Sequence, residues 1–179
     1  VSSALTLVSS SINAEKESES LLTAGNLARE GIEVVRMMRD SNWLAGASWD
    51  AGMTGATNDY SGIPVFSPAA NGWSINFTPN AVTDAAAKVY RYTTGSGNAV
   101  VGLMVQAGTQ PGGTAATQFS RVVFMDPLCD NGAGGYTIVT SGTACSTTKI
   151  GVRVTSKVRW TIKNKVKTLD MEERLLNWR

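Results

Sequence analysis

Residues 1–44 read VSSALTLVSSSINAEKESESLLTAGNLAREGIEVVRMMRDSNWL. In the second half of this stretch, apolar residues recur at steps of three and four, while Glu33 and Arg36 stay largely off the apolar side. This period is that of a helix packed on another element through one face. The apolar stripe consists of Leu21, Ala24, Ala28, Ile32, Val35 and Met38, widened by Leu27, Gly31 and Val34.

The first half carries a second apolar patch, which serines dilute and which no glycine or proline interrupts. A helix through the whole stretch, at ~1.5 Å per residue, is roughly 65 Å long, twice the ~34 Å diameter of a compact ~100-residue domain. We therefore expect a protruding helix whose Leu5, Val8 and Ile12 face a partner. This half is interpreted as a membrane-segment stub or an oligomerisation stalk. The alternatives are a cloning remnant, or residues 1–20 that fold back as a second helix or fray, with the charged residues 15–19 as a hinge.

Composition favours one domain, since 179 residues suffice for a sizeable core. Charged residues are 17% of the chain, below the ~25% of an average soluble protein, as suits an extracellular polymer or sandwich domain. A net charge of only +2 predicts no dedicated nucleic-acid binding.

Histidine is absent, which excludes histidine-based hydrolases and most zinc sites. Glu30 and Glu33 are interpreted as ion-pair partners of the neighbouring Arg29 and Arg36, because a glycosidase needs its carboxylates across a cleft. We expect no catalytic residue, no metal site and no cofactor, and so a protein that is not an enzyme. The chain has neither an apolar run of bilayer length nor a secretory signal, and we expect a trimmed product whose start lies upstream.

The two cysteines, Cys129 and Cys145, bracket a stretch rich in glycine and threonine that has few apolar residues to hold it. A disulfide between them would stabilise this loop by about 3 kcal/mol and would suit an oxidising compartment. The alternative is a pair of buried free thiols.

After the helix, alternating apolar residues predict short strands separated by glycine-rich loops. The predicted strands are 63–66, 73–77, 89–92, 100–105 and 118–125, with one helical turn within 79–87. The strand 118–125 is expected to end at Asp126-Pro127, because proline cannot donate to the ladder.

The clearest strand comes late in the chain, where apolar and basic residues alternate. Asn164-Lys165 is expected to turn it back into residues 166–169 as a hairpin. Asp170 and Glu173 then form a capping pair for a short final helix, with continued strand as the alternative. The apolar side of the strand consists of Ile150, Val152, Val154, Val158, Trp160 and Ile162, and Lys157, Arg159 and Lys163 lie on the other side.

These elements predict an α+β fold, in which a long N-terminal helix packs on an antiparallel sheet and a disulfide closes a loop near the C-terminal strands. Residues 1–44 form the helix, partly protruding and partly packed, and residues 45–179 form the sheet domain. The predicted helix–sheet core consists of Ile32, Val35, Met38, Val152, Val154 and Trp160.

Three runs carry a family resemblance: NLAREGIEVVR at 26–36, RDSNWL at 39–44 and LNWR at 176–179. They resemble the second half of the N-terminal helix, and the close, of type IV pilin-like proteins, nearest to a branch from ultra-small candidate-phyla bacteria. The family's basic leader, cleavage site and strongly apolar first segment are absent here, so none of their functional positions is carried over.

The resemblance implies a pilin-like fold and a structural subunit of an extracellular type IV pilus, with roles in adhesion, motility or DNA uptake. Its implied partners are further copies in a helical filament, the pilus assembly machinery and, before assembly, the membrane through an upstream helix. The runner-up is a pseudopilin or minor pilin of a secretion or DNA-uptake system.

A third hypothesis is a tethered cell-surface module that binds a glycan. Trp49 and Trp73 are its candidate ligand-contacting aromatics, since tryptophan rings stack on sugars, although core packing is the commoner role of such residues. The first apolar patch, the basic strand and these aromatics thus predict surfaces rather than a catalytic centre.

Overall fold

A computed structural model describes residues 2–56, 59–95, 100–140 and 143–177, with side chains from residue 7 onward. The helix α1 spans Ser2–Leu44 without interruption. It ends in a Schellman motif: the Gly46 N–H donates to the Trp43 carbonyl and the Ala47 N–H to the Asn42 carbonyl. Glycine suits this position because its φ is +68°.

Every strand pair in the described residues is antiparallel. The α+β class and the helix-on-sheet arrangement predicted from the sequence are confirmed. The elements after α1 are β1 (Ser61–Ser67), β2 (Gly72–Asn76), the 3-10 turn η1 (Ala85–Ala87), β3 (Lys88–Tyr92), β4 (Met104–Val105), β5 (Thr114–Asp130), β6 (Tyr136–Ile138), β7 (Lys149–Ile162) and β8 (Lys165–Leu176).

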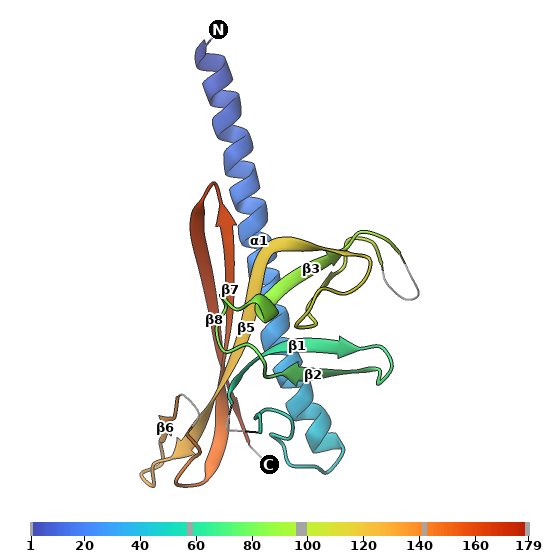
Figure 1. Cartoon of the computed structure of the whole chain (residues 1–179). Coiled ribbons are helices and arrows are strands. Elements are labelled where there is room, and N and C mark those ends of the chain that lie inside the picture. The colour runs from blue at the N-terminus through green and yellow to red at the C-terminus, as the bar shows by residue number, and fades with distance from the viewer. Residues whose placement is uncertain (1, 57–58, 96–99, 141–142, 178–179) are drawn as a thin grey trace.

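The longest strand, β5, organises the sheet (Figure 1). One edge of β5 pairs with β7, and its other edge pairs in turn with β3, β1 and β6. The predicted stop at Asp126-Pro127 is wrong, because β5 continues to Asp130. Met125 donates its N–H to Tyr60 on the β1 edge, so the nitrogen of Pro127, two residues on, faces the same edge between β1 and β6, where no ladder bond is lost.

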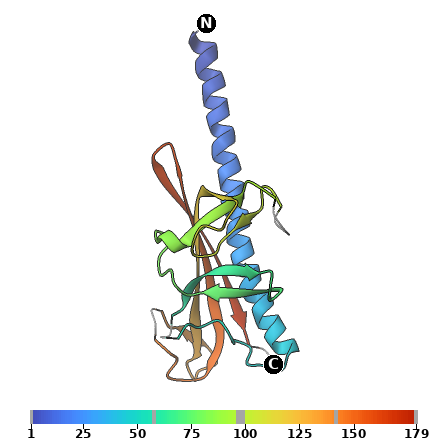
Figure 2. The same cartoon turned by 45° about the vertical axis from the view of Figure 1, so that its right-hand side comes forward.

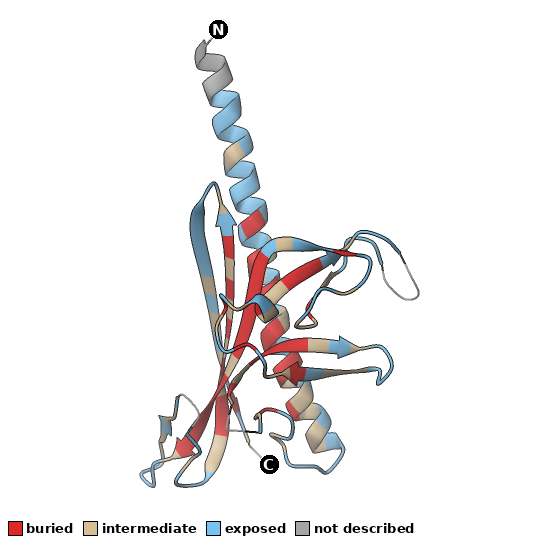
Figure 3. Ribbon diagram, viewed as in Figure 1, coloured by how far each residue is buried: buried red, intermediate tan, exposed pale blue. Residues whose placement is uncertain are grey.

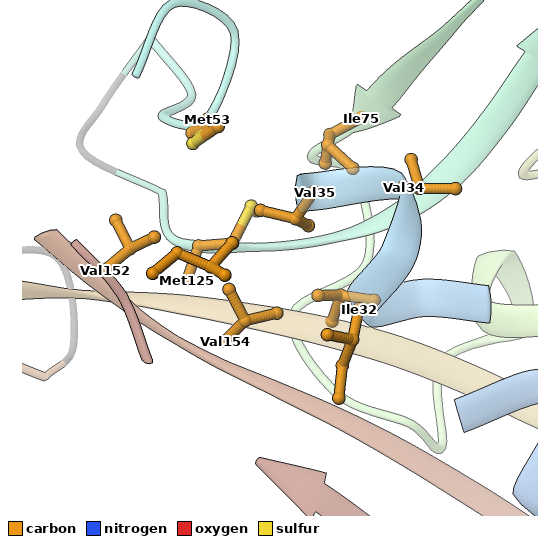
Figure 4. Close-up of a cluster of buried hydrophobic side chains, with 10 residues drawn as sticks. Ile32, Val34, Val35, Met53, Ile75, Met125, Val152 and Val154 are labelled. Atoms are coloured by element: carbon orange, nitrogen blue, oxygen red, sulfur yellow. The ribbon is translucent and has the colours of Figure 1, made fainter. Parts of the chain in front are cut away.

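The second half of α1 packs across β7, β8 and β5, whereas the first half extends beyond them (Figures 1 and 2). Alternate residues of β7 from Val152 to Trp160 are buried, as the sequence pattern predicted. Figure 4 shows the buried cluster in which α1 meets β2, β5 and β7. Its members are Ile32, Val34, Val35, Met53, Ile75, Val123, Met125, Val152, Val154 and Leu175, with the partly buried Met38 packed against them.

Trp160 lies in a second buried cluster nearer the stalk, together with Ala24, Leu27, Ala28 and Phe119. The first residue of the predicted stripe, Leu21, is instead exposed. Ser20, one residue earlier, is buried in its place, so the face of α1 that the sheet covers begins with Ser20 and Ala24 and leaves Leu21 to one side.

The C-terminal segment resolves the alternative left open by the sequence in favour of strand. The strand β8 pairs with β7 from Lys165 to Leu176, and this register places Asp170 opposite Lys157. The Asp170 carboxylate, which was expected to cap a helix, thus takes part in a cross-strand pair with Lys157 instead. The predicted end of that helix, Trp178, lies outside the described residues.

The predicted strand 100–105 is reduced to β4. Gly102 adopts a φ of +94°, its N–H donates to the Tyr92 carbonyl, and the turn so formed leaves Val100 and Val101 exposed. The helical turn expected within 79–87 is the short η1.

Candidate functional site

The candidate assembly site is the exposed half of α1, residues 2–19, which we call the stalk. Leu7, Val8 and Ile12 expose 70%, 57% and 47% of their surface (Figure 3). Val8 and Ile12 lie four residues apart and therefore on one face of the helix. Leu5, the third predicted contact residue, lies among the residues whose side chains are outside the description.

Polar contacts hold the base of the stalk against the sheet. The Gln118 amide donates to the Ser20 hydroxyl at 2.9 Å, and Lys167 of β8 lies 3.0 Å from a carboxylate oxygen of Glu17. The hydrogen bond and the charge of Lys167 lower the pKa of Glu17. The charged stretch 15–19, one candidate hinge in the sequence, is continuous helix here.

Arginines fix the packed half of α1. Arg36 donates to Glu33 in the preceding turn and to Glu173 of β8, and these hydrogen bonds raise its pKa. Arg39 lies 4.6 Å from the centre of the Trp43 ring and pairs with Asp40 at 2.9 Å. The stalk therefore continues from a half of α1 that both ion pairs and apolar packing hold against the sheet.

Glu30 and Glu33 do not form a pair of catalytic carboxylates. Glu33 pairs with Arg36 as the sequence predicted, but the partner of Glu30 is Arg121 of β5, at 3.3 Å. Arg121 is only 2% exposed, and burial lowers its pKa despite the nearby carboxylate. Its guanidinium also donates to Gln106 at 2.7 Å and to the Leu27 carbonyl at 2.8 Å. Sequence reasoning missed this network, since nothing local links residues 27, 30, 106 and 121.

The disulfide between Cys129 and Cys145 is present, with a Cα–Cα distance of 5.5 Å. It joins the end of β5 to the segment that precedes β7. Within the loop, the Asp130 carboxylate accepts from the Gly132 N–H and the Asn131 amide oxygen accepts from the Ala133 and Gly135 N–H groups. The loop is a hydrogen-bonded turn closed by a covalent link.

The two aromatics singled out for a ligand occupy different settings. Trp49 packs against the buried cluster, and the Lys149 ammonium lies 5.3 Å from its ring centre. Trp73 also touches the cluster, but it lines a surface groove together with Phe66, which sequence reasoning did not select. The sequence predicted Phe66 to lie in the strand 63–66, but nothing in it marked the ring as exposed.

No family model, curated protein or solved structure matches this chain. The resemblance to type IV pilins therefore stays a prediction. The functional interpretation is based on the exposed surfaces of the structure.

The described residues contain neither a metal-binding cluster nor a membrane-spanning helix. No group of three or more acidic or cysteine side chains in them is placed to hold a metal ion. Nor does any helix among them have the length and apolar character needed to cross a bilayer.

Basic residues on β7 and β8 are largely engaged by acidic partners. Lys157 lies 3.2 Å from Asp170, and Lys167 is bound to Glu17 of the stalk. Arg153 pairs with the buried Asp126 at 2.5 Å. Of the basic residues that the sequence placed on the outer side of this strand, Lys157 is thus paired with an acidic residue.

Proposed function

We propose that this chain is a structural subunit of an extracellular type IV pilus or pilin-like filament, and that it assembles through the stalk. The observation that supports this proposal most directly is the exposure of Leu7, Val8 and Ile12 on the part of α1 that projects beyond the sheet. Exposed aliphatic side chains on a projecting helix gain free energy when they pack against another copy.

The energy scale is adequate for a filament. Burying a few hundred Å² of apolar helix surface per neighbour contributes several kcal/mol at ~25 cal/mol per Å². A head-to-tail contact that does not close into a ring repeats along a fibre. The sheet domain then lies on the outside, where the disulfide-closed loop suits an oxidising environment.

In this proposal the protein is membrane-anchored before assembly machinery inserts it into the pilus, and it has no enzymatic role. A pseudopilin or minor pilin has the same geometry and differs in abundance and in filament length. Adhesion, motility and DNA uptake are the functions that such a filament serves.

The proposal is tested with the variant Val8→Glu, produced in the source cells in place of the normal chain. A charge at this exposed position does not disturb the sheet domain, but burial against a neighbour would desolvate it at large cost. We expect electron microscopy of the sheared surface fraction to show no filaments. The purified variant should keep the melting temperature of the unmodified chain.

Leu44→Glu is the matched control, because Leu44 is an 86% exposed leucine at the opposite end of α1. It introduces the same charge outside the stalk and should leave filaments intact. Normal filaments from Val8→Glu cells would contradict assembly through the stalk.

A further inference from the structure

A groove of about 500 Å³ lies between the β1–β2 ribbon and the segment around β4. Figures 1 and 2 show that β1, β2 and β3 extend to the same side of the molecule. Three aromatic side chains line the groove, namely Phe66, Trp73 and Tyr92, and Glu30 of α1 and Arg121 of β5 line it as well. It is separate from the stalk.

The aromatic pair on the ribbon is held in a fixed arrangement. Phe66 and Trp73 are directly opposite each other in the β1–β2 register, and their ring centres are 5.4 Å apart. Trp73 packs against the buried cluster, which restrains its ring, while Phe66 remains 44% exposed. The ribbon thus offers a rigid aromatic surface to a ligand in the groove.

The charged groups of the groove compensate each other. The buried Arg121 guanidinium is held by Gln106, Leu27 and Glu30, so its role is to orient the Glu30 carboxylate rather than to reach a ligand. The Glu30 side chain is 41% exposed and can accept further hydrogen bonds. Among the described lining residues these are the only charges, and they sum to zero.

Further hydrogen-bonding groups remain available. Within the described part of the chain, the indole N–H of Trp73, the hydroxyl of Tyr92 and the side-chain amide of Asn71 make no hydrogen bond, and all three residues line the groove. The groove therefore combines flat apolar rings with scattered donors and acceptors, which is the make-up of a specific small-ligand site.

This combination selects among ligand chemistries. An anion would meet the Glu30 carboxylate, and a cation would meet the positive charge of Arg121 directly behind it. A proline-rich peptide packs on aromatic rings, but proline has no N–H to donate to the carboxylate. A sugar supplies both apolar C–H faces for the rings and hydroxyl donors for Glu30.

We infer that this groove binds a neutral oligosaccharide, with sugar faces on Phe66 and Trp73 and hydroxyls donating to Glu30. The site differs from the sequence hypothesis in that Trp49 takes no part in it. The inference does not rest on filament assembly, because every described residue that lines the groove lies outside the stalk, and stalk variants leave the groove unchanged.

The test uses the full chain on an array of neutral hexose, N-acetylhexosamine and deoxyhexose oligosaccharides, followed by calorimetric titration of the strongest binder. Phe66→Ala removes an exposed ring and should weaken binding roughly tenfold. Glu30→Gln, which keeps an acceptor but loses its charge, should weaken binding by a smaller factor. Urea unfolding checks that both variants remain folded.

Tyr136→Ala is the control, because Tyr136 is an aromatic of β6 outside the groove, where it stacks with Arg174. Its affinity should equal that of the unmodified chain. Three results would each overturn the inference: no binding to any neutral oligosaccharide on the array, equal binding by Phe66→Ala, or binding of a decaproline probe in place of sugars.

Discussion

Gly25 and Gly31 lie on the same packed half of α1 but have opposite structural roles. A Cβ added at Gly31 would lie 2.5 Å from the Ser156 hydroxyl and 2.9 Å from a methyl of Val123. At Gly25 the nearest atom, from Leu169, is 4.0 Å away. Of the two glycines, only Gly31 makes a close approach to the sheet, where α1 crosses β7 and β5.

We therefore expect opposite effects of the same substitution. Gly31→Ala should lower the free energy of unfolding by about 1–3 kcal/mol, because the packed sheet has no room for the methyl group. Gly25→Ala should raise it by up to about 1 kcal/mol through helix propensity. Urea unfolding of the two variants measures both effects, and equal losses would contradict the packing described for α1.

Asp50 provides a pH-dependent contact at the residue scale. Burial raises its pKa, but the hydrogen bonds from Lys149 and Ser48 outweigh burial and leave the pKa below the ordinary 3.8. A depressed carboxyl pKa stabilises the folded chain above pH 3.8, and this contribution is lost as the pH falls through the folded pKa.

Asp50→Asn should accordingly lower the melting temperature at pH 7, and its deficit against the unmodified chain should shrink as the pH falls below 3.8. Lys149→Met should have a similar deficit at pH 7, because it removes the cation 2.8 Å from Asp50. Scanning calorimetry across this pH range measures the deficit. A deficit that stays constant down to about pH 3 would exclude the contact as its source.

The residue scale also shows why parts of the site escaped sequence reasoning. The Glu33–Arg36 pair was predictable because the partners are one helical turn apart. The pairing of Glu30 with Arg121 was not, since a basic residue in a predicted strand gives no sign that a helix will bury it. Long-range ion pairs depend on register, which residue types alone do not determine.

At the scale of elements, period and length were the reliable guides. The stripe in α1 and the alternation in β7 each follow the geometry of one element, and apart from Leu21 in α1 each predicted the buried face. The ends of β5 and β8 depend on neighbours instead. Pro127 is tolerated because of which edge its nitrogen faces, and β8 continues because β7 pairs with it to Leu176.

The disulfide is the element-scale feature with the clearest energetic consequence. Cys129 and Cys145 are 16 residues apart, and opening this loop should lower the free energy of unfolding by roughly 3 kcal/mol. We expect this loss in the double variant Cys129→Ala/Cys145→Ser by urea unfolding. Hydrogen exchange should accelerate mainly within residues 131–148, and acceleration spread evenly over β7 and α1 would contradict a local role.

At the scale of the whole molecule, the fold and its protruding helix were predictable, whereas the groove was not. A helix of 43 residues is too long for a sheet of this size to cover, so protrusion follows from length. The groove needs Phe66 and Trp73 on one ribbon to meet Glu30 and Arg121 from two other elements. Only the assembled topology brings these four residues together.

The division of the molecule into a stalk and a sheet domain gives each part a separate proposed task. The stalk provides aliphatic surface for self-association, and the sheet domain with the packed half of α1 carries the loop and the groove that would face outward. A variant that abolishes self-association should still allow ligand binding to be measured, since no described groove residue lies in the stalk.

Immunogold electron microscopy of the source cells, with an antibody raised against residues 45–179, tests the central claim most directly. A filament subunit predicts continuous label along thin surface filaments, because every repeat carries one sheet domain. Label confined to the cell envelope or to filament tips would contradict it.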